Sequence, residues 1–280
     1  MTDPHRVTRH YGTDPLIARI EAALEEAGLA EGRLDWREVA GLDQFHVRGL
    51  AASRDLAAAL APARDAHVLD IGSGLGGPAR LLAAEHGCRV TGIDLSAAFV
   101  AVANLLAART GLDAQVAYRE ADALALPFAD GSFDHGWTQH VAMNIADRAG
   151  LYREIHRVLK PGARLAIYDV VAGNGEAVVY PVPWAREAAI SHLLDQDAMR
   201  AALLEVGFSV LRWEDTTAAG IAWYEAQAKR LPAVGEVSRA ALAAGLGLAM
   251  GPEFGAMVAN LGRNLREGRV RLVQAVMARG

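Results

Sequence analysis

The sequence predicts an α/β fold, in which an open, mostly parallel sheet carries helices on both faces. Two observations lead to this prediction. From residue 67 onward, short apolar runs alternate with helical stretches, the pattern of a parallel sheet with crossover helices. The first of these runs continues directly into a glycine-rich turn and a helix, within the stretch LDIGSGLGGPARLL. A chain of 280 residues, 52% of them hydrophobic, can build one packed domain with an elaboration.

The chain before the alternating pattern is expected to be helical. Residues 14–30 read as a helix that Asp14 caps, with Pro15 at its first position and Gly28 near its end. A second helical stretch, AASRDLAAALA, is closed by Pro62. We therefore expect residues 1–65 to form an N-terminal helical cap.

Strands and helices then alternate through the expected core, residues 66–217. Ser96 and Gly111 are expected to begin and end one of its helices, and Pro161-Gly162 to end another. The predicted strands are HVLDIGS, RVTGIDL, QVAYREAD, SFDHGWTQHV, ARLAIYDVV and SVLRWEDTT, followed by a seventh in RVRLVQAVM. Residues 218–268 are expected to form a helical lid insertion, and residues 269–280 the final core strand.

Composition narrows the function. The net charge is −5 without any basic run, so a nucleic acid is not an expected partner. The N-terminus is polar, and no apolar stretch is long enough to span a membrane. We therefore expect a cytoplasmic protein without a membrane contact. Because Cys88 is the single cysteine, neither an internal disulfide nor a cysteine zinc cluster can form, and we expect no metal.

The glycine loop allows two interpretations. Gly72, Gly74 and Gly77 fit G-x-G-x-x-G with Asp94 after the next strand, which is compatible with a nicotinamide-dependent oxidoreductase. However, Asp70 directly before the loop and Asp122 after the third strand would repel a pyrophosphate. Several acids around one pocket favour a nucleoside that lacks phosphates and carries a positive charge, namely S-adenosylmethionine.

Four linked stretches carry a family resemblance: LDIGSGLGGPARLLA, GIDLS, DALALPFADGSFD and REIHRVLKPGARLAIYD. Over residues 66–215 the chain resembles class I S-adenosylmethionine-dependent methyltransferases. It is similar to the branch that contains sarcosine/dimethylglycine N-methyltransferases and tocopherol C-methyltransferases. The resemblance implies a Rossmann-like, doubly wound sheet of seven strands whose last strand is antiparallel.

The resemblance also implies a set of cofactor-binding residues. Asp70 would serve the amino end of the cofactor through the loop and waters, Asp94 the ribose, and Asp122 the adenine amine. The full expected set is Asp70, Gly72, Ser73, Gly74, Gly76, Asp94, Leu95, Asp122, Ala123, Gln139 and Gln44.

Acceptor-binding and catalytic residues are expected at the carboxyl ends of the strands and in the segments that close over them. The expected acceptor-binding residues are Trp137, Met143, Asn144, Asp169, Tyr180, Trp184 and Tyr224, and the expected catalytic residues are His140, Tyr11 and His46. Structural roles compete with these, since His140 could equally be a hydrogen-bonded wall histidine, Trp137 could belong to the core and Trp184 could only pack.

We therefore expect methyl transfer from S-adenosylmethionine to a small-molecule substrate, preferably N-methylation of a small amine or amino acid. The alternative is C- or O-methylation of an aromatic or quinone-like metabolite, which the apolar stretch VVYPVPW favours. An apolar pocket without carboxylates near the methyl group would support that alternative, and an acidic or aromatic cage would support the amine. A protein that binds the cofactor without catalysis is a third hypothesis, and a homodimer is compatible with the sequence.

Overall fold

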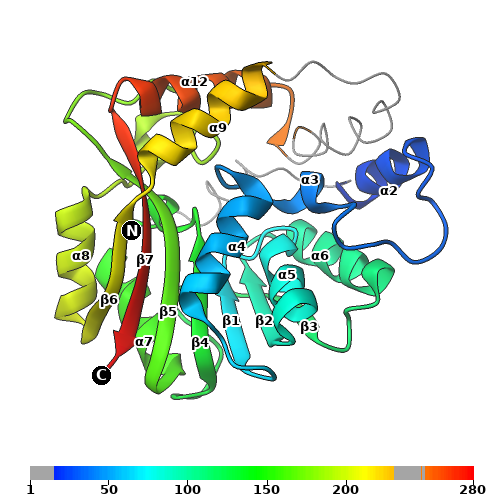
Figure 1. Ribbon diagram of the computed structural model, residues 1–280, viewed down its shortest axis with the longest axis horizontal. Helices are drawn as coiled ribbons and strands as arrows, with labels where there is room; N and C mark the ends of the chain where they lie inside the picture. The colour runs from blue at the N-terminus through cyan, green and yellow to red at the C-terminus, as the bar shows by residue number, and fades with distance from the viewer. Residues whose placement is uncertain (1–15, 230–246, 248–249) are drawn as a thin grey trace.

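The computed structural model describes residues 16–229, 247 and 250–280. Its centre is a seven-stranded sheet in the order β3-β2-β1-β4-β5-β7-β6 (Figure 1). The five strands β1 to β5 pair in parallel, whereas β7 lies between β5 and β6 and is antiparallel to both. The strands are β1 (His67–Ile71), β2 (Arg89–Asp94), β3 (Val116–Glu120), β4 (Phe133–Gln139), β5 (Leu159–Ala172), β6 (Phe208–Asp215) and β7 (Val270–Arg279). The predicted fold class, including the antiparallel last strand, is confirmed.

Helices cover both faces of the sheet because the central strands bury side chains on both sides. Neighbouring strand residues such as Val68 and Leu69 belong to different hydrophobic clusters. One cluster joins the sheet to α4, α5 and α6, and the other joins it to α7 and α8. These helices are α4 (Gly49–Leu60), α5 (Gly77–His86), α6 (Ala97–Thr110), α7 (Arg148–Val158) and α8 (Gln196–Glu205).

The helix ends follow the predicted signals in most places. The Ser96 hydroxyl accepts a hydrogen bond from the Phe99 backbone N–H at 3.3 Å, and Gly111 closes α6 at a φ of 65°. The predicted end of α7 at Pro161-Gly162 is wrong, because α7 ends at Val158 and β5 begins at Leu159. A residue that precedes proline is pushed toward extended backbone, which places Lys160 in the strand.

The N-terminal segment contributes α2 (Leu16–Glu26) and α3 (Ala40–Asp43). The predicted cap Asp14, Pro15 and the candidate catalytic Tyr11 lie outside the described residues. Gly28 adopts a φ of 72° shortly after α2 ends. A cluster of buried side chains that includes Leu16, Ile20 and Leu24 packs α2 against α6.

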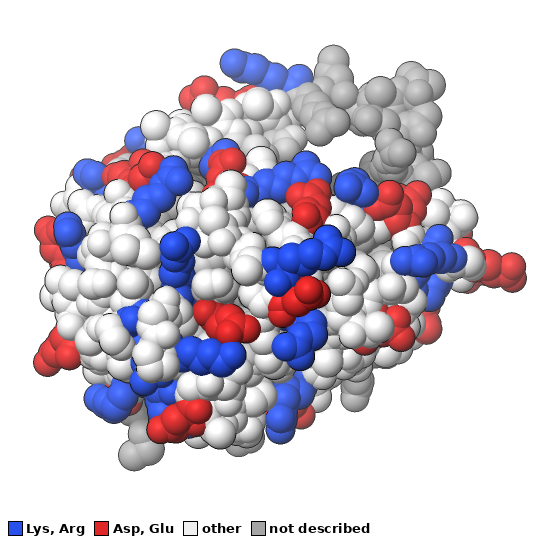
Figure 2. Space-filling view, turned by 60° about the horizontal axis from the view of Figure 1, so that its bottom comes forward, with Lys and Arg blue, Asp and Glu red and all other residues white. Residues whose placement is uncertain are grey.

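Two helices of the predicted insertion lie at the end of the sheet where the parallel strands finish. They are α9 (Thr217–Lys229) and α12 (Phe254–Arg266), which pack against each other and against β7 (Figure 1). Among the described residues, none of the helices has the length and apolarity needed to cross a membrane. Cationic and anionic side chains are intermixed over the face drawn in Figure 2.

Candidate active site

The glycine loop between β1 and α5 is shaped by a side chain of β3 and a side chain of the segment that follows β4. Gly72 has a φ of 70°, and a Cβ there would meet the Val141 Cγ2 atom at 2.4 Å. Gly76 has a φ of 82°, and its Cβ would meet the Tyr118 hydroxyl oxygen at 2.3 Å. Only glycine combines a left-handed backbone with such close neighbours. The loop therefore passes tightly under the chain that follows β4.

Asp94, the last residue of β2, connects the loop to the start of α6. Its carboxylate accepts hydrogen bonds from the backbone N–H groups of Gly74 at 3.0 Å and Ser96 at 2.9 Å. Burial raises the pKa of Asp94, although these backbone donors oppose the shift. The carboxylate lines the cavity described below, so its remaining lone pairs face a place that a ligand can occupy.

Asp70 lies one strand away and is almost completely buried. Its Oδ2 atom has no hydrogen-bond partner among the described residues. Burial, together with the charge of Asp94, raises the pKa of Asp70 to about 8. Two carboxyl groups in this arrangement favour a positively charged ligand at the loop.

A cavity of about 510 Å³ opens at the carboxyl ends of the parallel strands, beside the glycine loop. This is the place where open α/β sheets bind ligands, at the point where the strand order reverses between β1 and β4. The structure brings many of the expected residues to its wall. These are Gly72, Gly74, Asp94, Leu95, Asp122, Ala123, Gln139, His140, Met143, Asn144 and Trp184.

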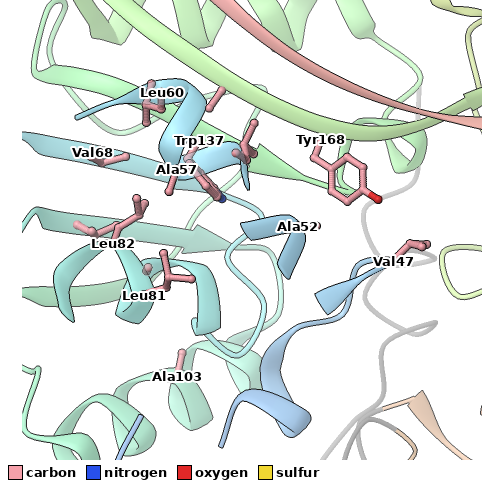
Figure 3. Packing of buried hydrophobic residues seen from close by; sticks show 14 of the residues in the cluster. Val47, Ala52, Ala57, Leu60, Val68, Leu81, Leu82, Ala103, Trp137 and Tyr168 are labelled. Atoms are coloured by element: carbon pink, nitrogen blue, oxygen red, sulfur yellow. The ribbon is translucent and has the colours of Figure 1, made fainter. Parts of the chain in front are cut away.

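Five expected site residues do not line this cavity. They are Trp137, Tyr180, Tyr224, Asp169 and His46. Trp137 is fully buried in the core near Ala57 and Val68 (Figure 3). Its indole N–H donates to the Gln139 Oε1 atom at 3.0 Å, so it supports a wall residue from behind.

The other four are held by contacts of their own. Tyr224 packs on Gly262 of α12, and Tyr180 packs against the edge of the larger core cluster. The Asp169 carboxylate accepts a hydrogen bond from the Val141 backbone N–H at 3.0 Å. The His46 Nε2 atom lies 2.9 Å from the Gly49 carbonyl oxygen, and burial lowers the His46 pKa to about 4.

Four expected cofactor residues, Gln44, Asp70, Ser73 and Gly76, also stand behind the wall. Ser53 donates from its hydroxyl to the Gln44 Oε1 atom at 2.7 Å. The Gln44 Nε2 atom, the Ser73 hydroxyl and the Gln139 Nε2 atom are buried without a hydrogen-bond partner among the described residues. Such a group of buried unpaired polar atoms is costly unless a ligand or waters complete it.

His140 is the expected catalytic residue that does reach the cavity. It follows β4 with a φ of 53°, a backbone conformation that non-glycine residues adopt at strained positions. Burial, aided by His46, lowers the His140 pKa well below its usual value, so the imidazole is neutral at pH 7. Its Nε2 atom has no hydrogen-bond partner among the described residues.

Part of the cavity wall and one buried ion pair were not among the residues predicted from the sequence. Phe45 and Phe99 stack at a centroid distance of 5.8 Å on one side, and Phe254 of α12 lines the cavity as well. Behind the loop, the fully buried Arg80 guanidinium donates to the Asp43 carboxylate at 2.5 Å. Of these residues, only Arg80 falls within a stretch quoted for the family resemblance, LDIGSGLGGPARLLA.

Comparison with known proteins agrees with this geometry. The sequence model of one family, described as a methyltransferase domain, matches residues 69–167. The chain is 31% identical over 189 residues to the O-methyltransferase resE of Aspergillus sclerotiorum, covering 64% of this chain and 69% of that one. The chain spans a smaller part of four other curated relatives, for which the match covers 42–64% of their length. They include the methyltransferase GfsG of Streptomyces halstedii and a sterol 24-C-methyltransferase of Kluyveromyces lactis.

Two solved structures show the same fold at low sequence identity. The geranyl diphosphate C-methyltransferase of Streptomyces coelicolor A3(2) superposes with a TM-score of 0.69 at 20% identity, over 99% of this chain and 98% of that chain. A putative sarcosine dimethylglycine methyltransferase of Galdieria sulphuraria superposes with a TM-score of 0.65 at 22% identity, over 83% and 85%.

The sheet order and the acid-lined glycine loop define an α/β protein that binds a nucleoside cofactor at its strand ends. The matched domain and the relatives identify the family: the chain belongs to the class I S-adenosylmethionine-dependent methyltransferases. The oxidoreductase interpretation of the loop is thereby superseded. The cofactor is S-adenosylmethionine.

The described residues fit this cofactor. Its α-ammonium group and sulfonium are cationic, and the buried Asp70 and the half-buried Asp94 lie at the glycine loop. We propose that Asp94 accepts from the ribose hydroxyls and Asp122 from the adenine amine, as the positions of both on the cavity wall allow. The unpaired Gln139 and Ser73 groups are proposed to complete the amino-acid end.

Proposed function

We propose that the enzyme methylates an uncharged, largely apolar small molecule at oxygen or carbon. The observation that carries this proposal is the composition of the cavity wall beyond the cofactor-binding residues. Its side chains there are mainly aromatic and aliphatic: Phe45, Met143, Ile145, Pro183, Trp184, Met250 and Phe254. Apolar walls of this kind select flat or hydrophobic ligands.

The proposal departs from the preferred expectation of a small amine. The carboxylate in this part of the wall is Asp147, which lies exposed at the rim. Its Oδ1 atom accepts a hydrogen bond from the Gly150 backbone N–H at 2.8 Å, as the N-cap of α7. A cationic amine would lose its hydration there and meet mainly apolar groups, which is costly. A neutral acceptor carries no charge and would not have this cost.

The aromatic side chains Trp184 and Phe254 support an acceptor site that holds the acceptor between two walls. The Trp184 indole N–H donates to the Ser191 hydroxyl at 2.9 Å, which holds the ring in one orientation. Trp184 and Phe254 come from different segments and line the same cavity. We propose that they and Met250 sandwich the acceptor and exclude water from it.

His140 is proposed to remove the acceptor's proton. S-adenosylmethionine supplies a methyl carbon on a positively charged sulfur, which the acceptor displaces in line. His140 lines the cavity, and its neutral imidazole has a buried Nε2 atom without a partner among the described residues. We propose that this nitrogen takes the proton of an acceptor hydroxyl as its oxygen attacks. The remaining requirement is alignment of the acceptor, which the wall provides.

The test is a methyl-acceptor screen with the purified protein and S-adenosylmethionine, in which S-adenosylhomocysteine formation is measured. The panel contains phenols and hydroquinones on one side and glycine, sarcosine and ethanolamine on the other. We expect turnover of the phenolic or quinol compounds, and a loss of about 100-fold or more in kcat in His140→Gln. His86→Gln, at the last residue of α5, is the matched control. Faster methylation of the amines, or full activity of His140→Gln, would contradict the proposal.

A further inference from the structure

The turn that carries His140 is held from behind by a side chain that does not touch the cavity. Its backbone is anchored to β5 at two points. The His140 N–H donates to the Tyr168 carbonyl oxygen at 2.7 Å, and the Val141 N–H donates to the Asp169 Oδ1 atom at 3.0 Å. The second anchor is charge-assisted and therefore stronger than a bond to a neutral acceptor.

The same turn borders the cofactor and acceptor parts of the cavity. Val141 lies so close over Gly72 that a Cβ at Gly72 would clash with it. His140 keeps its strained φ of 53° and lines the cavity, and its imidazole packs against the Tyr168 ring at a centroid distance of 4.8 Å. Such a conformation persists only where the surroundings impose it. A shift of this turn would therefore move the proton acceptor relative to the glycine loop.

Asp169 is buried, and the groups around its carboxyl act on its charge in opposite directions. It is 1% exposed, and its Oδ2 atom has no hydrogen-bond partner among the described residues. Burial raises its pKa to about 6, whereas Arg148 and the backbone N–H groups of the turn lower it. The charged and titratable side chains that face it are Arg148 and Tyr152, both on α7.

We propose that Asp169 is a positioning residue for methyl transfer: through the backbone of residues 140–142 its carboxylate sets where the His140 imidazole and Val141 stand. The expected effect on turnover rests on the proposed role of His140. The positioning of the turn at residues 140–142 by Asp169 does not depend on that role. Protonation of Asp169 would weaken the anchor while His140 remains neutral. The rate is therefore expected to fall as the pH drops through about 6.

The experiment compares Asp169→Ala, Asp169→Asn and the control Asp195→Asn in histidine-labelled protein. Asp195 also accepts a backbone N–H bond, from Ala198 at 2.7 Å, but on the exposed start of α8. The His140 imidazole resonance, assigned with His140→Gln, is recorded with S-adenosylhomocysteine bound. We expect it to move in Asp169→Ala, to stay near its original position in Asp169→Asn, whose amide oxygen can still accept, and not to change in Asp195→Asn.

Turnover of the best acceptor from the screen is the second readout. In Asp169→Ala we expect kcat to fall by about 10–100-fold while the affinity for S-adenosylhomocysteine changes by about threefold or less. Asp169→Asn should recover most of kcat and lose the acid limb of the pH profile. An unmoved His140 resonance in folded Asp169→Ala would overturn the inference. A moved resonance together with full activity of His140→Gln would uphold the inference and reject only the proposed base.

Discussion

Replacing Asp70 by asparagine should stabilise the ligand-free protein at neutral pH. Folding holds this carboxyl protonated, since burial raises its pKa from 3.8 to about 8. For an acid with a raised folded pKa, stability is fully present below pH 4 and declines as the pH rises to about 8. The cost grows by about 1.4 kcal/mol per pH unit above 3.8, which gives an upper bound of about 4 kcal/mol at pH 7.

Asparagine avoids this cost but brings N–H donors to a place where the Asp70 Oδ2 atom has no partner. An unpaired buried donor costs about 1–3 kcal/mol, so the net gain expected at pH 7 is about 1–3 kcal/mol. For a chain of this size, that corresponds to an increase in Tm of about 2–10 °C. Near pH 4 the pH-dependent cost of burying the carboxyl is gone and only the cost of the unpaired donor remains, so Asp70→Asn is expected to be less stable than the parent chain by about 1–3 kcal/mol there.

Thermal unfolding of Asp70→Asn and the parent chain, followed by circular dichroism between pH 4 and 8, measures this difference. Asp134→Asn is the matched control with the opposite sign. Its carboxylate accepts from Lys160 and from the His67 N–H, which lower the Asp134 pKa, so this variant should lose stability above pH 4. If Asp70→Asn were destabilised equally at pH 4 and pH 7, the reasoning about the buried acid would be refuted.

Two further substitutions test the cofactor site and its support. Asp94→Ala should weaken S-adenosylhomocysteine binding by about 10–100-fold in calorimetric titration, because a carboxylate that accepts from the ribose is lost; unchanged affinity would remove that assignment. Arg80→Met should lower the free energy of unfolding by about 3–5 kcal/mol in urea titration, because it leaves the Asp43 carboxylate buried and unpaired. The double variant Arg80→Met/Asp43→Leu should regain most of this loss, and a double variant as unstable as the single one would contradict the ion-pair explanation.

The sheet and its helices could be predicted because their signals are local. The cap Ser96 and the closing Gly111 stand beside the helix that they bound, and each central strand is a short apolar run. The end of α7 was misplaced because the Pro161-Gly162 pair was expected to stop the helix. The backbone restriction before proline had already extended the chain at Lys160.

The site could be predicted only where its residues follow strand ends. Asp94, Asp122 and His140 all stand there and line the cavity. Phe254 reaches the same cavity from more than a hundred residues further along the chain, and no local pattern marks it. Trp137 shows the opposite case. It shares a strand face with Gln139 but stands two residues before the end of β4, where its side chain is buried in the core.

The glycine loop explains why its motif alone does not choose between cofactors. Gly72 is required by Val141 and Gly76 by Tyr118, whatever ligand binds, because both neighbours approach closer than a Cβ allows. The glycines therefore report a tight turn between β1 and α5, which several nucleotide-binding proteins share. The ligand is selected by charge instead. A pyrophosphate would be repelled by the Asp94 carboxylate and would raise the Asp70 pKa further, whereas a sulfonium with an ammonium group would favour the ionised form of both carboxyl groups. The acids next to the motif, rather than the motif, carry the information on the cofactor.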